Sequence, residues 1–329
     1  MARVSEQSEM NVQPLVSVAI PAYNSEHTLG KTIESVLAQV TDFPVEIVVG
    51  EDGSKDGTFA VADSYRKRYP GFVRVLEREK NLGMSRNYYE TFEACRGKYI
   101  AWLDSDDYWT DPEKLAIQTK VLEDDATIAI VCHVVRWVQG GEVKRERYPA
   151  LAPGRYGMDQ IVRSNFLPSP SVIFRNGIHK QLPEWYFDIA PMTDWPLYVV
   201  AAHTGDIVLL DRVMADYTLN ATSFFWGKGD AFWYKRDGEF YEYMKEIVPK
   251  SFLRLARAEQ GKRYESLAYY IRKQGDFVGS RKAAIKAALA PALFDNVGSK
   301  MSTLLASVVR ELEWRGRGQK EAKGEASSS

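Results

Sequence analysis

The sequence has few cysteines and no long apolar run. Its two cysteines, Cys95 and Cys132, lie in apolar surroundings without CxxC spacing, so we expect a reduced, cytoplasmic protein with neither disulfides nor a structural metal site. No stretch approaches eighteen uninterrupted apolar residues, and the N-terminus MARVSEQSEMNVQP is polar. These absences predict a protein that neither spans a membrane nor is secreted through a signal peptide.

Net charge is also nearly absent, because 43 basic residues face 44 acidic ones. No global field attracts the chain to nucleic acid, and we expect no nucleic-acid partner. Two nucleotide-binding signatures are missing as well. No G-x-G-x-x-G follows the first apolar segment, which argues against a dehydrogenase. The segment IPAYNSEHT lacks the Gly-rich basic loop of a sugar nucleotidyltransferase.

Short apolar segments alternate with longer amphipathic ones between residues 15 and 124. The strand-like segments are LVSVAI, VEIVVGED, FVRVLE and KYIAWLD. The helix-like segments are HTLGKTIESVLAQV, TFAVADSYRKRY, SRNYYETFEACR and PEKLAIQTKVLED. This order predicts an α/β fold with a mostly parallel sheet flanked by helices. Ligands bind beyond the carboxyl ends of such strands, here IPAYN, VGEDGS and LDSDD.

The remaining segments predict the domain organisation. IAIVCHVVRWV, SVIFRN and IVLLDRVMADYTL, with a helix near residues 195–203, predict a mixed continuation of the same domain. Beyond about residue 231, four helices are expected between Gly and Pro breakers: FLRLARAEQ, YESLAYYIRKQ, SRKAAIKAALA and MSTLLASVVRELEW. We therefore expect a flexible N-terminus (1–13), an α/β domain (14–230), a helical region (231–315) and a disordered tail (316–329).

Three carboxylates follow the apolar residues of AWLDSDDYW within four positions. Asp104, Asp106 and Asp107 repel one another and need a counter-charge or open water. A Mn or Mg ion, held by one or two carboxylates and the phosphates of a nucleotide, is one such counter-charge. The alternative is that the acids are helix caps and a solvated loop. That alternative explains Asp111, which precedes Pro112 as an N-cap, but leaves Asp104 and Asp106 unexplained.

Two other predicted strand ends carry polar residues at the same edge of the sheet. VVGEDGSKDGT places Glu51 and Asp52 after an apolar strand, with Gly53 and Gly57 freeing the backbone, and residues 20–26, IPAYNSE, do the same. Each segment alone is also an ordinary turn sequence. Three polar strand ends at one rim together predict a binding site.

Four blocks together resemble the family 2 glycosyltransferases of the GT-A fold. They are VSVAIPAYNSEHTLGKTIESVLAQ, EIVVGEDGSKDGT, NLGMSRNYYETFEACRGKYIAWLDSDDYW and the more divergent MTDWPLYVVAAHTGDIVLLDRVMADYTLNATS. The resemblance implies a GT-A catalytic domain with a mixed acceptor-side region and a C-terminal helical extension. It implies inverting, metal-dependent transfer of a sugar from a nucleoside diphosphate sugar to an acceptor hydroxyl by in-line displacement. UDP or dTDP is the favoured nucleotide, and the acceptor is a saccharide or lipid-linked saccharide.

The resemblance also assigns roles to residues. The nucleotide-binding positions that it implies are Pro21, Ala22, Tyr23, Asn24, Glu26, Asp52, Gly83, Arg86, Asp104 and Ser105. Asp106, with Asp107 as a second candidate, matches the ligand of a Mn or Mg ion that bridges the phosphates. Asp194 falls where the family has its catalytic aspartate, a general base. Because Trp-Pro follows it, Asp194 also fits a helix N-cap.

One departure from the family concerns the loop after the last strand. The family often has Tyr-Arg-x-His-x-x-Ser there, whereas YTLNATS places Thr218 and Asn220 at the Arg and His positions. This change removes a metal or phosphate contact. It leaves room for the alternative function, a non-catalytic nucleotide-sugar binding protein or a scaffold of a polysaccharide assembly.

Basic residues near the C-terminus suggest a membrane contact. Arg281, Lys282 and Lys286 stand among alanines and leucines, and Arg315 and Arg317 stand beside Trp314. We therefore expect peripheral contact with the anionic inner face of the cell membrane. The alternative is that these helices pack on the catalytic domain or on a second subunit of a homo-oligomer.

Overall fold

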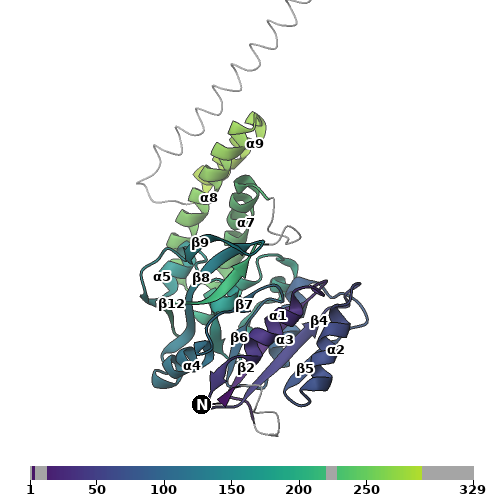
Figure 1. Ribbon diagram of the computed structural model, residues 1–329. Coiled ribbons are helices and arrows are strands. Elements are labelled where there is room, and N and C mark those ends of the chain that lie inside the picture. Colours follow the sequence, from purple (N-terminus) through teal and green to yellow (C-terminus); the bar gives the residue numbers. More distant parts are fainter. Residues whose placement is uncertain (1, 4–12, 220–227, 291–329) are drawn as a thin grey trace, which may run out of the picture. The chain divides into compact units, whose positions relative to one another are not determined.

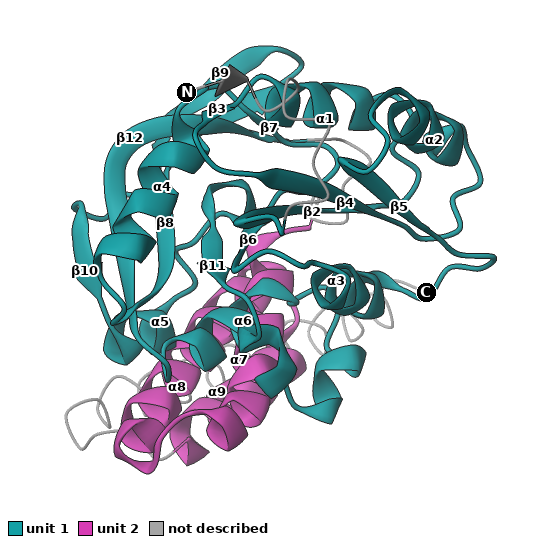
Figure 2. Ribbon diagram, turned by 90° about the horizontal axis from the view of Figure 1, so that it is seen from below, with its two compact units in different colours: residues 1–226 teal, residues 227–329 magenta. Residues whose placement is uncertain are grey.

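The computed structural model describes residues 2–3, 13–219 and 228–290, and the chain divides into two compact units, residues 1–226 and 227–329 (Figure 2). The first unit holds a ten-stranded sheet whose main path runs β10-β12-β8-β11-β6-β2-β4-β5 (Figure 1). Asn220, the helix expected at 301–314 and the tail from residue 316 lie outside the described residues.

Half of the sheet is parallel, as the alternation predicts. Its strands, in the order β6-β2-β4-β5, are β6 (Tyr99–Trp102), β2 (Val16–Ala22), β4 (Val45–Glu51) and β5 (Val73–Glu77). The helices between and after them are α1 (Leu29–Leu37), α2 (Thr58–Arg68), α3 (Met84–Glu93) and α4 (Lys114–Asp124). Every residue of β2 and β4 is buried, which is typical of parallel strands covered on both faces.

Helices cover both faces of this half. Figure 2 shows α1 and α2 on one side of β2, β4 and β5, and α3 on the other. Leu29, Ile33 and Val36 of α1 recur at helical spacing and are fully buried in the same core as Val18 and Ile20 of β2. The helices thus hold the parallel strands so that their carboxyl ends open at one edge.

Helix α4 begins later than expected. Asp111 does not cap it, because its Oδ1 accepts the Glu113 N–H at 3.0 Å in a turn before Lys114, where the helix starts. The other Asp111 oxygen pairs with Arg212 Nε at 2.5 Å. The aspartate therefore closes a local turn and anchors β12 (Asp206–Thr218).

The second half of the sheet is mixed, as expected. Its strands are β7 (Tyr108–Trp109), β8 (Ile128–Gln139), β9 (Glu142–Tyr148), β10 (Gly154–Tyr156), β11 (Ile173–Arg175) and β12. β8 and β12 are parallel, while β11 runs antiparallel between β6 and β8, and β9 antiparallel on β8. The helical elements are α5 (Met158–Arg163), η2 (Ser169–Ser171), η3 (Ile178–Gln181), η4 (Glu184–Asp188) and α6 (Asp194–Ala201). A separate pair joins β1 (Ala2–Arg3) to β3 (Val40–Thr41).

The second unit is helical, with α7 (Asp230–Ile247), η5 (Lys250–Phe252), α8 (Leu253–Lys273) and α9 (Phe277–Leu289). The prediction of two helices between residues 252 and 274 is wrong, because α8 runs through Gly261 without a break. The cost of that glycine, about 1 kcal/mol, is offset by packing against α7. Gln260 donates to the Gly238 carbonyl at 3.0 Å, and a Cβ on Gly238 would lie 2.9 Å from the Tyr264 ring.

None of the described helices is both long enough and apolar enough to cross a bilayer. Both cysteines are buried and form no disulfide with each other. Burial raises the pKa of both thiols, which keeps them protonated and unreactive at neutral pH.

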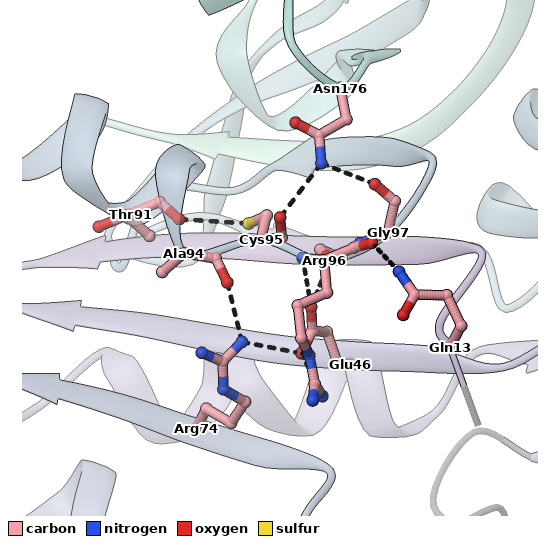
Figure 3. Close-up of polar contacts among 10 residues, drawn as sticks. Gln13, Glu46, Arg74, Thr91, Ala94, Cys95, Arg96, Gly97 and Asn176 are labelled. Carbon is pink, nitrogen blue, oxygen red and sulfur yellow. Dashed lines mark hydrogen bonds and ion pairs between the residues drawn. The ribbon is translucent and has the colours of Figure 1, made fainter. Parts of the chain in front are cut away.

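A buried carboxylate ties together the amino ends of the strands (Figure 3). Glu46 of β4 is 2% exposed and accepts hydrogen bonds from Ser17 Oγ at 2.6 Å, Arg74 Nη1 at 3.1 Å and Arg96 Nε at 2.9 Å. Burial by itself raises the pKa of Glu46, but these bonds outweigh it and hold the pKa below its usual value. This network lies at the end of the sheet opposite the expected site.

We expect Glu46→Ala to lower the free energy of unfolding by about 2 to 4 kcal/mol, because it leaves two arginines without their carboxylate. The loss is measured by urea unfolding at pH 7. Since the folded pKa of Glu46 is depressed, its contribution is present above the unfolded pKa and disappears as the pH falls through the folded value. The matched control is Glu142→Ala, which removes an exposed partner of Lys144 and should change stability little. Equal losses in both variants would contradict the network's role.

Candidate active site

The three polar strand ends meet at one edge, as the sequence predicts. The register pairs Ala22 of β2 with Glu51 of β4, and β6 lies on the other side of β2. Hydrogen bonds join the loops that follow. The Asn24 N–H donates to Ser54 Oγ at 3.0 Å, and Ser25 Oγ lies 2.7 Å from Ser105 Oγ.

The loop after β2 is held by its own polar side chains. Asn24 has a left-handed backbone, φ 50°, and its Oδ1 accepts the Lys55 N–H at 3.0 Å. Glu26 Oε2 accepts the Gly57 N–H at 2.6 Å, an approach that a Cβ on Gly57 would obstruct. Pro21 and Ala22 are buried, whereas Tyr23 is 42% exposed. Of the residues predicted to bind the nucleotide, Tyr23 is therefore the one that offers an open ring.

Asp52 joins the loop after β4 to the start of α3. Its carboxylate accepts the N–H groups of Leu82 at 2.9 Å and Gly83 at 3.1 Å. Burial raises the pKa of Asp52, although both bonds and the charge of Arg78 oppose the rise. Gly83 has φ 89°, which favours glycine at this junction. The predicted contact of Asp52 with a base stays a prediction.

Arg86 lies in the first turn of α3 and is exposed. Its guanidinium is 4.0 Å from the centre of the Phe187 ring, a cation–π contact with η4. The N–H groups along the edge of the guanidinium can still donate hydrogen bonds to a base or a phosphate, which is the role that the family resemblance implies.

The carboxylate of Asp104 is oriented by three donors. Oδ1 accepts from Tyr88 Oη and from Trp102 Nε1, both at 2.9 Å, and Oδ2 accepts from Ser169 Oγ at 2.5 Å. The donors come from α3, β6 and η2, so three separate elements set the position of this half-buried acid.

The rest of the acidic turn is held from α1 and β12. Thr32 Oγ1 donates to the carbonyls of Ser105 and Asp107, at 3.0 and 2.8 Å. Asp107 is 2% exposed, and its Oδ1 accepts the Thr218 N–H at 2.6 Å. Burial raises the pKa of Asp107 well above its usual value, and the charges of Asp106 and Asp104 add to the rise. Asp107 therefore anchors the end of β12, while Asp106 remains half-buried beside it.

A metal would find a small set of oxygen ligands at this turn. Within the described ranges, no group of three or more His, Cys, Asp or Glu side chains could hold a metal ion by itself. Mg and similar ions are usually held by one or two carboxylates, with phosphates and water completing the shell. The mutual repulsion of Asp104, Asp106 and Asp107 is the kind of crowding that such a cation relieves. The donor set thus fits an ion shared with a diphosphate.

Asp194 is the first residue of α6, one position after the N-cap Thr193. Its Oδ1 accepts the N–H of Trp195 at 2.7 Å, and its Oδ2 accepts from Asn165 Nδ2 at 2.7 Å. Burial raises the pKa of Asp194 to about 6 against the lowering effect of these bonds, and the charge of Asp104 adds to the rise. Asp194 therefore accepts a hydrogen bond from the first turn of α6. It also has the pKa of a candidate base near neutral pH.

Three residues of this site carry no signal in the sequence: Tyr88, Asn165 and Ser169. Tyr88 reads as one more aromatic residue of an amphipathic helix, and Asn165 and Ser169 lie in a loop region with no motif. A fourth residue, Tyr217, matches the first position of the family's Tyr-Arg-x-His-x-x-Ser loop, but no role was predicted for it. Burial raises the pKa of Tyr217 well above its usual value, and so do the charges of four carboxylates: Asp107, Asp104, Asp106 and Asp194. Tyr217 thus lies within electrostatic range of these four acids.

Known proteins share both the motifs and the fold. The model of "Glycosyl transferase family 2" matches residues 17–180, about half of the chain. An uncharacterised protein of Mycobacterium tuberculosis is 33% identical over 208 residues, which are 63% of this chain and 59% of the relative. The chain therefore matches less than two thirds of this relative's length.

Solved structures show the same architecture. S. aureus TarS in complex with UDP-GlcNAc superimposes with a TM-score of 0.61 at 17% identity, covering 92% of each chain. The mannosyltransferase PcManGT from Pyrobaculum calidifontis, in complex with GDP-Man and Mn²⁺, gives 0.56 at 16% identity, covering 92% of this chain and 88% of that one. At these identities the likeness concerns the fold alone, a curled mixed sheet with helices of the GT-A type. Because the family model spans the strands and loops that build the site, and the fold agrees, the chain belongs to glycosyltransferase family 2.

Proposed function

We propose that this chain is an inverting glycosyltransferase that moves a sugar from a nucleoside diphosphate to an acceptor hydroxyl. The observation that supports this most is Asp194, a half-buried carboxylate with a pKa raised to about 6, near enough to Asp104 to interact with its charge. It stands beside the acidic turn where a diphosphate would bind. Direct displacement needs a base and a leaving-group site that lie close to each other.

The proposed step is a single in-line displacement. The acceptor oxygen forms a bond to the anomeric carbon, while the bond from that carbon to the diphosphate oxygen breaks and the nucleoside diphosphate leaves with the electron pair. Asp194 takes the acceptor proton on its carboxylate. With a pKa of about 6, most Asp194 side chains are ionised and ready to accept a proton at pH 7.

The proposed cofactor is Mn or Mg. Asp106 would hold the ion, with Asp107 as the weaker candidate because its Oδ1 already accepts the Thr218 N–H. When bound, the ion would neutralise the charge that grows on the leaving diphosphate. PcManGT, which shares the fold, was solved with GDP-Man and Mn²⁺. Asp104 would then be free to face the ribose, with its orientation set by Tyr88, Trp102 and Ser169.

The proposed donor is a UDP or dTDP sugar. Its base and ribose would lie against the loop of residues 21–26, with Asp52, Gly83 and Arg86 on the other side and Ser105 next to Asp104. TarS, with the same fold, was solved with UDP-GlcNAc. A saccharide or lipid-linked saccharide is the proposed acceptor.

We place the enzyme in the cytoplasm, with peripheral contact at the inner face of the membrane. On α9 the exposed side chains include Val278 (45%), Ile285 (42%) and Leu289 (75%), at positions that share a face with Lys282 and Lys286. Apolar and basic residues on one face suit an anionic bilayer surface. Failure to sediment with anionic vesicles at low salt, together with concentration-dependent dimerisation, would instead favour a homo-oligomer.

A thermal-shift screen of sugar nucleotides, with and without manganese, tests the function. We expect UDP or dTDP sugars with manganese to raise the melting temperature, since a ligand that binds only the folded state stabilises it. Product analysis of the best donor should then show slow hydrolysis without acceptor. A protein that no sugar nucleotide stabilises, in either condition, would not be a glycosyltransferase of this kind.

A further inference from the structure

A row of side chains crosses three strands next to the acidic turn. In the sheet register, Tyr217 of β12 lies opposite Trp137 of β8, and Trp137 lies opposite Arg145 of β9. Residues directly opposite one another in a sheet present their side chains on the same face. Tyr148 lies opposite Val135 of β8. Because Val135 is two residues before Trp137 on that strand, Tyr148 belongs to the same face.

The three rings of this row pack against the main core and are open to solvent only in part. The Trp137 ring centre lies 4.9 Å from that of Tyr148 and 6.4 Å from that of Tyr217. All three rings are half-buried, so part of each remains accessible. Arg145 is exposed, and its guanidinium lies 5.2 Å from the ring centres of both Trp137 and Tyr148. We call these four residues the aromatic row.

The aromatic row adjoins both parts of the proposed catalytic site. Thr218, the next residue after Tyr217, donates its N–H to Asp107 at 2.6 Å, which fixes this end of the row against the acidic turn. The charge of Asp194 acts on Tyr148 and Tyr217 and raises the pKa of each beyond the effect of burial. The row therefore lies within electrostatic range of the candidate base.

Arg145 differs from the other cations of β9. Lys144 pairs with Glu142, and Arg147 pairs with Asp211, whereas Arg145 has no carboxylate partner among the described residues. Its Nε donates to the Arg147 carbonyl at 3.0 Å, which leaves both terminal nitrogens for a ligand. A guanidinium held between two rings presents a planar fork that suits a carboxylate or phosphate.

We propose that the aromatic row binds the acceptor, and that this acceptor is an acidic saccharide. A sugar ring would pack its apolar C–H face on Trp137 and Tyr217, while a carboxylate or phosphate on the same or the adjoining ring would pair with Arg145. Aromatic faces offer large apolar area, and tyrosine adds a hydroxyl for the sugar's polar groups. The inference rests on the proposed function and adds the chemical class of the acceptor to it.

Two glycosides that differ only in charge test this. We measure binding of para-nitrophenyl β-glucuronide and para-nitrophenyl β-glucoside by ligand-observed NMR, without nucleotide. The wild-type protein should bind the glucuronide about 10- to 150-fold more tightly, the factor that one charge-assisted hydrogen bond supplies. Glucose 6-phosphate against glucose is the second pair, and it shows whether carboxylate or phosphate is preferred.

Single substitutions show which side chain is responsible for the charge preference and which for binding of the sugar ring. Arg145→Gln should abolish the preference for the charged member of each pair, because it removes the cation and keeps most of the side-chain length. Trp137→Leu should weaken both members about equally. The matched control is Lys144→Gln, which removes a neighbouring cation that already pairs with Glu142, and it should bind as wild type does.

Two results would overturn the acceptor role: no binding of any probe at millimolar concentration, or a charge preference that survives in Arg145→Gln. Affinity for UDP with manganese is measured in the same variants and should stay unchanged, so a parallel loss of nucleotide and glycoside binding would also count against it. Failure of the proposed function has a different signature, because there the wild-type protein would bind no sugar nucleotide at all.

Discussion

Asp194→Asn is expected to lower the rate of sugar transfer by about a hundredfold to ten-thousandfold, the usual contribution of a general base. The amide keeps the shape of the side chain, and its oxygen can still accept the Trp195 N–H. Binding of the nucleotide with manganese should therefore be retained. Turnover at saturating donor and acceptor is the measurement, and full activity in this variant would remove Asp194 from the mechanism.

The pH dependence of the wild-type rate follows from the same residue. A base must be ionised, and the pKa of Asp194 is raised to about 6, so the rate should fall as the pH is lowered through about 6. The Asn variant should lack this acidic limb. The raised pKa also affects stability. Protonated Asp194 stabilises the folded protein at low pH, and this contribution is lost as the pH rises through the folded pKa, so ionised Asp194 lowers the folding stability at neutral pH.

That stability argument separates loss of chemistry from loss of fold. Asp194→Asn removes a half-buried charge but also the oxygen that accepts from Asn165, so its stability at pH 7 should stay close to that of wild type. Asp159→Asn, a change of an exposed acid on α5, is the matched control and should leave both rate and stability unchanged. A clear drop in the melting temperature of Asp194→Asn would mean that its low rate reflects damage to the fold.

Asp106→Ala is expected to abolish the metal dependence of nucleotide binding. The ion would lose a protein ligand, so the affinity for UDP in the presence of manganese should fall to the value measured with a chelator. Manganese titrations of nucleotide binding, followed by calorimetry, measure this. An unchanged titration in the variant would refute the assignment of Asp106 as a ligand.

Asp107→Asn provides the comparison within the same turn. Asn can still accept the Thr218 N–H, so the end of β12 should stay in place, and the variant removes a carboxylate whose pKa is raised well above its usual value by burial. If Asp106 alone holds the ion, Asp107→Asn should keep metal-dependent nucleotide binding. An equal loss in both variants would show that the two acids share the metal.

Much of the fold is predictable from local pattern. The strands β2, β4, β5 and β6 and the helices between them follow from apolar segments of the right length and period, because each such element must bury its apolar face. The errors arise where local signals compete with packing. Gly261 reads as a helix breaker, yet the contact of α8 with Gly238 of α7 keeps the helix continuous. Asp111 reads as a cap, yet its nearest N–H belongs to a turn.

The site divides in a similar way. The acids Asp52, Asp104 and Asp106 are predictable, because each follows a strand directly and parallel strands bring their carboxyl ends together. Asn165 is not predictable, since it reaches Asp194 from 29 positions away through a region without a motif. Ser169 likewise reaches Asp104 across 65 positions. Side chains that orient an acid need only one donor atom, and a single donor leaves no pattern in the sequence.

The sequence by itself determined the class of fold, the edge of the sheet that carries the site and the acids that stand there. Those features depend on periodicity and on short motifs, which are local properties of a chain. Only the tertiary structure decided which residues complete the site. In the order β12-β8-β9, Trp137 and Arg145 lie opposite each other on neighbouring strands of one hairpin, whereas Tyr217 joins their row from β12, far along the chain. Strand pairing over such distances is set by packing of the whole sheet, and no short segment contains it.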